Sequence, residues 1–130
     1  MANEENPRTI FLDEGIYSPS SNNEYYPIAV PNNVKLKGMN SENTILDAEG
    51  TSSVIRLIDS ENITIRDLTI KGGFATKGSG IYSHDSNSSI LNVIIKENIL
   101  DESLGRWSGQ GGGIYIKQNV MNLDSVYIVK

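Results

Sequence analysis

The chain has no cysteine, one histidine and one tryptophan among its 130 residues. Without cysteine there are no disulfides, no thiol nucleophile and no thiolate metal site. No segment approaches the roughly 20 apolar residues of a membrane-spanning helix, so membrane insertion is not expected. Basic residues are also scarce, since 11 Lys and Arg face 16 Asp and Glu, for a net charge of −5. This balance disfavours nucleic acid as a partner, because phosphate backbones select clustered cations.

One pattern is written three times from residue 53 onward. Each copy opens with an alternating apolar run: Val54–Leu57, Gly80–Ser83 and Gly113–Ile116. Each copy closes with a second run: Leu68–Ile70, Val93–Ile95 and Val126–Ile128. The spacing from opening isoleucine to closing run is 13, 12 and 12 residues, whereas the connection to the next copy grows from 13 to 21. Such a period is the sequence signature of a solenoid.

A further short apolar run precedes each closing run. These runs are Ile63–Ile65, Ile90–Leu91 and Met121–Leu123. Only one or two residues separate them from the closing runs, which is too short for a crossover helix. We expect a corner at Asp67, Asn92 and Ser125, because Asp and Asn tolerate left-handed backbone angles. The chain is therefore predicted to be all-β: a parallel β-solenoid of about four coils of three short strands, stacked about 4.8 Å apart.

The two ends of the chain are expected to differ. Residues 1–24 are assigned to an N-terminal segment and cap, with a strand at Thr9–Leu12 lying across the end of the solenoid and a loop at Ser18–Glu24. Residues 25–130 are assigned to the coils, of which the first has strands at Pro27–Val30, Val34–Leu36 and Thr44–Leu46. Lys130 follows directly on the last strand, so no C-terminal cap is expected. An uncovered rung indicates a segment of a longer protein, or a surface that pairs with another copy.

The corner residues, the Gly-Gly-Gly-Ile-Tyr-Ile run of residues 111–116 and the Ile-Lys-Glu-Asn run of residues 95–98 resemble repeats of a known group. They are similar to right-handed parallel β-helix repeats of pectate-lyase-like proteins and of large bacterial surface proteins. The resemblance covers residues 25–130 and implies a right-handed solenoid and an extracellular or cell-surface location in a bacterium. It does not imply an activity, because this fold carries many unrelated functions.

Two outward columns of the opening strands are the first candidate site. If Ile55, Ile81 and Ile114 point inward, their neighbours point outward. One column then holds Ala29, Arg56, Tyr82 and Tyr115, and the next holds Ile58, His84 and Lys117. One interpretation is aromatic packing on a sheet face. The other is a carbohydrate platform, in which aromatic faces meet C–H groups while Arg56, His84 and Lys117 meet hydroxyls or carboxylates.

The long connection Glu97–Gly113 is the second candidate site. It contains Arg106 and Trp107, and loops on a rigid scaffold commonly carry binding groups. The alternative is that Trp107 and two leucines of this loop fold over an apolar side. Glu97, Asp101 and Glu102 offer oxygen ligands for Ca²⁺, although their spacing matches no recognised calcium loop.

Catalysis is not favoured by the sequence. A lyase of this fold requires a Lys or Arg base beside Ca²⁺ in an acidic cluster, and a hydrolase requires paired carboxylates, but neither pattern lies on the strands. Asp67 is explained by turn geometry, and Asp85 is expected to point away from His84. We therefore expect a structural or adhesive extracellular module that contacts polysaccharide and has no catalysis of its own. The alternatives are the N-terminal part of a polysaccharide lyase or glycoside hydrolase, and a self-assembling subunit that associates through its C-terminal rung.

Overall fold

The computed structural model describes residues 6–105 and 109–130, which form an almost entirely β structure. In this part of the chain lie thirteen strands and one helix of a single turn, α1 (Pro19–Asn22). The strands are β1 (Arg8–Phe11), β2 (Gly15–Tyr17), β3 (Ile28–Ala29), β4 (Val34–Lys37), β5 (Thr44–Asp47), β6 (Ile55–Ile58), β7 (Ile63–Lys71), β8 (Phe74–Ala75), β9 (Ile81–His84), β10 (Asn87–Lys96), β11 (Ile99–Leu100), β12 (Ile114–Lys117) and β13 (Val120–Ile128).

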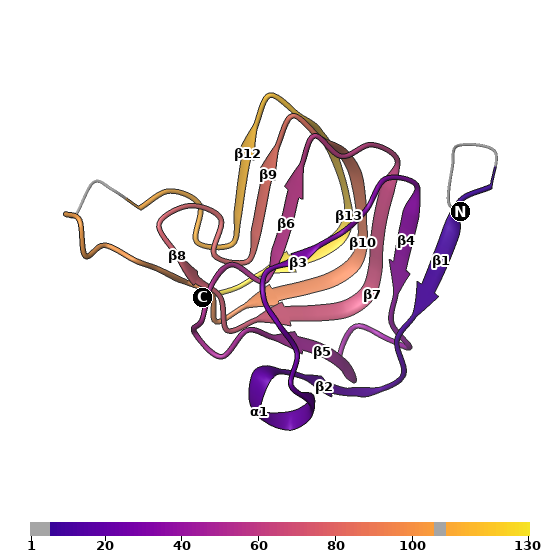
Figure 1. The fold of residues 1–130 in the computed structure, drawn as a ribbon, viewed down its shortest axis with the longest axis horizontal. Coiled ribbons are helices and arrows are strands. Elements are labelled where there is room, and N and C mark those ends of the chain that lie inside the picture. Colours follow the sequence, from indigo (N-terminus) through magenta and orange to yellow (C-terminus); the bar gives the residue numbers. More distant parts are fainter. Residues whose placement is uncertain (1–5, 106–108) are drawn as a thin grey trace.

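The strands stack into a parallel β-solenoid of about four turns (Figure 1). The largest sheet has the order β1-β4-β7-β10-β13, with β2 and β5 completing its first two rungs. A second sheet has the order β3-β6-β9-β12, and a short third sheet pairs β8 with β11. All of these pairings are parallel. The predicted fold class is therefore confirmed.

Alternation along each strand sends every second side chain into the core. Leu36, Ile65 and Ile90 occupy equivalent positions in successive coils and are all buried. The same holds for Leu68 and Val93 beyond the corner. The core is a stack of aliphatic columns, because each buried side chain packs on its equivalent one strand spacing away.

The predicted corners are bends within single strands and not breaks between two strands. Asp67, Asn92 and Ser125 have left-handed backbone angles, with φ of 59°, 52° and 54°. Hydrogen-bonded pairing continues on both sides of each, so β7, β10 and β13 each span two of the predicted runs. In the first coil the loop between β4 and β5 takes the place of the bend. It covers Thr69, whose hydroxyl donates to the backbone carbonyl of Ser41.

The N-terminal segment differs from the prediction. The strand β1 does not lie across the end of the solenoid, but pairs in parallel with β4, and β2 pairs with β5. Together they add a partial rung, because the described residues place no strand beyond β3 in the second sheet. The expected loop at Ser18–Glu24 contains α1, whose N-cap Ser18 accepts from the backbone N–H of Ser21. The division at residue 24 stays a prediction.

The last rung is only partly buried. Three of its inward side chains, Ile116, Leu123 and Ile128, are 42%, 47% and 53% exposed, whereas Ile114, Met121 and Val126 are half-buried and pack against the core. Among residues 6–105 and 109–130, no strand pairs with the far side of β12 or β13.

Candidate functional site

The predicted outward column is present on the second sheet. Backbone pairing places Arg56 beside Ala29, Tyr82 beside Arg56, and Tyr115 beside Tyr82. The predicted inward and outward directions are therefore correct for this sheet. Arg56 is exposed, whereas both tyrosines are half-buried.

Three side chains of this column stack on one another, and a lysine from the β8–β9 connection contacts the last of them. The rings of Tyr82 and Tyr115 lie 5.4 Å apart between centroids, at an interplanar angle of 16°. The Cζ of Arg56 lies 5.3 Å from the Tyr82 centroid, and the Nζ of Lys77 lies 5.5 Å from the Tyr115 centroid. We call these four residues the tyrosine–cation ladder. Its contacts combine aromatic stacking with cation–π attraction.

The geometry changes what the ladder offers to a ligand. Arg56 and Tyr115 come from coils on opposite sides of Tyr82, so both faces of that ring are covered. The expected contact between sugar C–H groups and an open ring face is not available at Tyr82. Ring edges, phenolic hydroxyls and cationic groups remain accessible, and these suit hydrogen bonds and charge more than stacking.

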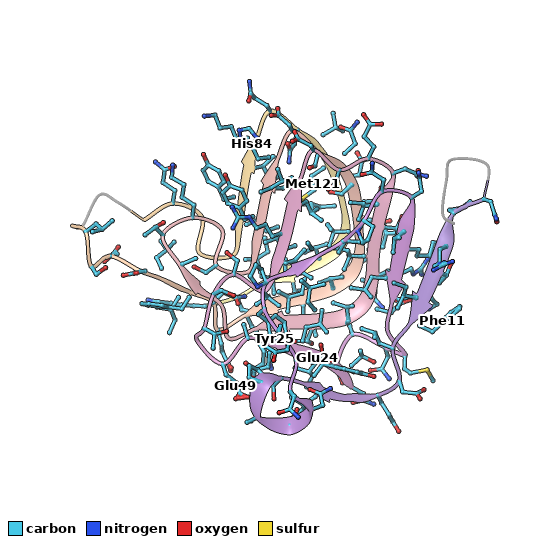
Figure 2. All side chains as sticks on the ribbon, in the orientation of Figure 1. Phe11, Glu24, Tyr25, Glu49, His84 and Met121 are labelled. Atoms are coloured by element: carbon cyan, nitrogen blue, oxygen red, sulfur yellow. The ribbon has the colours of Figure 1, made fainter. Side chains whose placement is uncertain are left out.

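The neighbouring column also matches its predicted register. His84 pairs with Ile58 on one side and with Lys117 on the other, and Figure 2 shows His84 at the edge of the molecule opposite α1. Contrary to the sequence-based expectation, Asp85 does not point away. Its backbone turns into the left-handed region with φ of 50°, which ends the alternation and brings its Oδ2 to 2.9 Å from His84 Nδ1.

A hollow of about 220 Å³ lies beside the ladder. Its lining residues are Ser53, Arg56, Ala75, Thr76, Lys77 and Tyr82. We call it the cationic hollow. Sequence reasoning missed Lys77, because this residue lies in the connection between β8 and β9, where no strand periodicity predicts the direction of a side chain. The one clue was the Gly-rich connection around it, which lets the chain pass close to the sheet.

The second predicted site is described only in part. Arg106 and Trp107 lie outside the described residues. Two of the three carboxylates that the sequence offered as calcium ligands have other partners: Glu97 Oε2 lies 3.0 Å from Lys71 Nζ, and Asp101 Oδ1 accepts from the backbone N–H of Ser103 at 2.9 Å. Within residues 6–105 and 109–130 no three carboxylate or imidazole groups gather as a metal site.

The Lys71 pair is electrostatically coupled. The hydrogen bond with Glu97 raises the pKa of the Lys71 ammonium, and the same bond lowers the pKa of the Glu97 carboxyl. Asp47 Oδ2 lies 3.9 Å from the same ammonium. These contacts join successive coils at the surface, and the Lys71 ammonium is already paired with carboxylates.

The Asp67 corner is more than a turn. The Oδ2 of Asp67 lies 2.6 Å from Lys37 Nζ and 2.8 Å from Arg66 Nε, and its Oδ1 accepts from Asn92 Nδ2 at 2.8 Å. Burial opposes ionisation of Asp67, but the hydrogen bonds from Lys37, Asn92 and Arg66 outweigh it and lower its pKa to about 2. Because Lys37 and Asn92 belong to the coils on either side, the cluster fastens three coils together.

Comparison with known proteins gives one similarity. The chain is 32% identical over 97 residues, 70% of its length, to metabotropic glutamate receptor-like protein P of Dictyostelium discoideum, of which it spans only 6%. No protein-family model matches the chain, and no solved structure matches it significantly. The parallel solenoid is therefore established by the structure, whereas membership of the pectate-lyase-like group and a bacterial origin stay predictions.

Proposed function

We propose that this chain is a structural or adhesive coil segment of an extracellular β-solenoid, which contacts carbohydrate through the outer face of the β3-β6-β9-β12 sheet. The observation that carries the proposal is the tyrosine–cation ladder. It stacks two tyrosine rings on the outer face of this sheet and brings a guanidinium and an ammonium against them.

The position of Tyr82 favours this use of the ladder. Its side chain lies between Arg56 and Tyr115 from the coils on either side, so little of its freedom remains to be lost when a ligand binds. Sugars present many hydroxyls, and the exposed part of the ladder is rich in donors for them. His84 and Lys117 extend the same face by a second column.

An extracellular or cell-surface location is supported by the similarity to a receptor-like protein. It also accords with the resemblance to large surface proteins. Among the described residues, no helix has the length and apolar character required to cross a membrane.

The first test is a glycan-array screen followed by affinity measurements on the ladder variants. We expect Tyr82→Ala and Tyr115→Ala to weaken binding of an array hit by about tenfold or more, which corresponds to about 1.4 kcal/mol. Tyr127→Ala is the matched control, because Tyr127 is 71% exposed on β13 in the other sheet. A glycan that binds all three variants as tightly as the unaltered chain contradicts the proposal.

A second candidate function is self-association through the last rung. It is favoured by the outer edges of β12 and β13, which pair with no further strand in the described part of the chain, and by the half-exposed apolar positions on these strands. Strand edges of this kind are templates for pairing with another chain.

A further inference from the structure

A second hollow, of about 260 Å³, lies beside α1 and shares no lining residue with the cationic hollow. We call it the α1 hollow. Figure 2 shows Glu24 and Tyr25, two of its residues, on the side of the molecule that carries α1. The lining residues are Pro19, Asn23, Glu24, Tyr25, Tyr26 and Thr51.

Hydrogen bonds fix the surroundings of the α1 hollow. The Tyr26 hydroxyl donates to the backbone carbonyl of Tyr17. The Oε1 of Glu49 accepts from the backbone N–H of Ser20 at 2.8 Å, which ties α1 to the turn that carries Thr51. The hollow therefore exists before any ligand arrives, and little ordering is required of it on binding.

The charge around the α1 hollow is negative. Glu24 is half-buried, and in the described part of the chain no basic side chain pairs with Glu24 or Glu49. Burial raises the pKa of the Tyr26 hydroxyl, and the negative charges of Glu24, Asp47 and Glu49 raise it further. Because Lys71 Nζ lies 3.9 Å from Asp47 Oδ2, the uncompensated charge comes from Glu24 and Glu49.

Tyr25 gives the α1 hollow an open aromatic surface. The residue is 90% exposed, and among the described residues its ring stacks on no other ring and meets no cation. It differs in this respect from Tyr82, whose two faces are covered. The face of an aromatic ring is negative and attracts cations. The ring of Tyr25 is therefore free to contact a positively charged group.

We propose that the α1 hollow binds an organic cation, an alkylammonium or guanidinium group, against the ring of Tyr25 and the carboxylate of Glu24. The ring supplies cation–π attraction, and the carboxylate accepts a charge-assisted hydrogen bond. The group is carried either by a free amine or by a lysine or arginine side chain of a partner protein. This site is separate from the proposed carbohydrate face and does not depend on it.

The lining limits the ligand to this class. Glu24 is the one carboxylate among the described lining residues, whereas Ca²⁺ takes six to eight oxygen ligands. Among the same residues there is no Lys, Arg or His to attract an anion. The hollow is smaller than the range of about 300–1,000 Å³ common for sites that enclose a whole small ligand, so it accommodates one cationic group. The net charge of −5 favours the approach of cations in general.

The first arm of the test locates the cation with small probes. Amide chemical shifts are followed during titration with butylammonium chloride or methylguanidinium chloride, against sodium chloride at equal ionic strength. We expect saturable shifts for the two organic cations, centred on residues 23–26 and 51. Sodium chloride should give no such localised, saturable response.

Variants of the two contacting residues test their roles. Glu24→Gln and Tyr25→Leu should each weaken binding of butylammonium about threefold or more. Glu61→Gln is the charge-matched control, because Glu61 is exposed between β6 and β7. Tyr127→Leu is the control for the ring, because Tyr127 is 71% exposed on β13. Both controls should titrate like the unaltered chain.

The second arm distinguishes the two sources of the cation. Affinities are compared for butylammonium, for short peptides that contain lysine or arginine, and for the same peptides with norleucine or citrulline in place of the charged residue. We expect a charged peptide to bind more tightly than its uncharged counterpart, and Glu24→Gln should remove the difference. A charged peptide that binds about tenfold more tightly than butylammonium identifies a partner protein as the source. Equal affinities identify the free amine.

Three outcomes would overturn the inference. One is that neither organic cation produces localised, saturable shifts at the α1 hollow. Another is that Glu24→Gln and Tyr25→Leu bind butylammonium as tightly as the unaltered chain. The third is that calcium chloride produces the same shifts and retains them in Tyr25→Leu, which would assign the hollow to an inorganic cation. None of these outcomes affects the carbohydrate proposal, which is tested by Tyr82→Ala and Tyr115→Ala.

Discussion

The middle coils and the last coil have the same inward pattern but very different burial. Ile95 on β10 is fully buried, whereas Ile128, its paired neighbour on β13, is 53% exposed. Ile90 and Leu123 differ in the same way, at 0% and 47% exposure. Alternation sets the direction of a side chain, but only a coil on each side removes it from water. In a solenoid, stability is therefore a property of neighbouring pairs of coils.

The corners of the middle coils and of the last coil differ in the same way in their side-chain hydrogen bonds. Asp67 is buried and bonded to residues of three coils. Ser125, which occupies the equivalent bend of β13, donates its hydroxyl to the adjacent Asp124 in the same strand. Both residues adopt the left-handed backbone conformation, but it is the Asp67 corner whose side-chain hydrogen bonds reach neighbouring coils.

The largest expected effect comes from a matched pair of isoleucines. Ile95→Ala should lower the free energy of unfolding by about 2–5 kcal/mol, because it removes fully buried methyl groups and leaves a cavity. Ile128→Ala should cost less than about 1 kcal/mol, since much of that side chain is already in water. Urea unfolding of both variants measures the difference. Equal losses would mean that the last rung is covered in solution.

The Asp67 corner should give an intermediate, pH-dependent effect. An unfolded Asp titrates at about 3.9, and Asp67 in the folded chain at about 2. The carboxylate therefore contributes stability that is fully present above about pH 5. This contribution, about 2 kcal/mol, is lost as the pH falls from about 4 to about 2.

Asp67→Asn, which retains tolerance for the left-handed backbone, tests this expectation. The gap in unfolding free energy between this variant and the unaltered chain should be widest near neutral pH and close toward pH 2. Asp124→Asn changes an exposed carboxylate next to the last corner and is the control. A gap that stays constant from pH 7 to pH 2 would exclude ionisation of Asp67 as its origin.

The smallest expected effect is association through the uncovered rung. Sedimentation velocity should show a weight-average mass that rises with protein concentration. Ile128→Glu should suppress the rise by placing a charge among the apolar positions of that rung. Ile58→Glu is the control, because Ile58 is similarly exposed at 43% but faces outward from β6. A clean monomer at high concentration would remove self-association as a function.

Much of the fold followed from the sequence, because strands of a solenoid must alternate and coils must keep their register. The stack of Tyr82 on Tyr115 was predictable for that reason. The contacts of Lys77, Asp67 and His84 were not. Lys77 lies in a connection where no strand periodicity predicts the direction of its side chain. Lys37 and Asn92, which bond Asp67, come from the two neighbouring coils, and the sequence does not specify which side chains of those coils reach the corner. Asp85 turns toward His84 only because its backbone leaves the strand conformation.

The parallel register of β6, β9 and β12 makes the ladder extensible. Any further coil that joined β12 in the same register would add one position to the row without displacing the residues already there. Weak contacts repeated along one polymer strengthen one another through their high effective concentration. If the ladder binds polysaccharide as proposed, the number of coils would control avidity, and a longer chain would bind a repetitive polymer more tightly without improving any single contact.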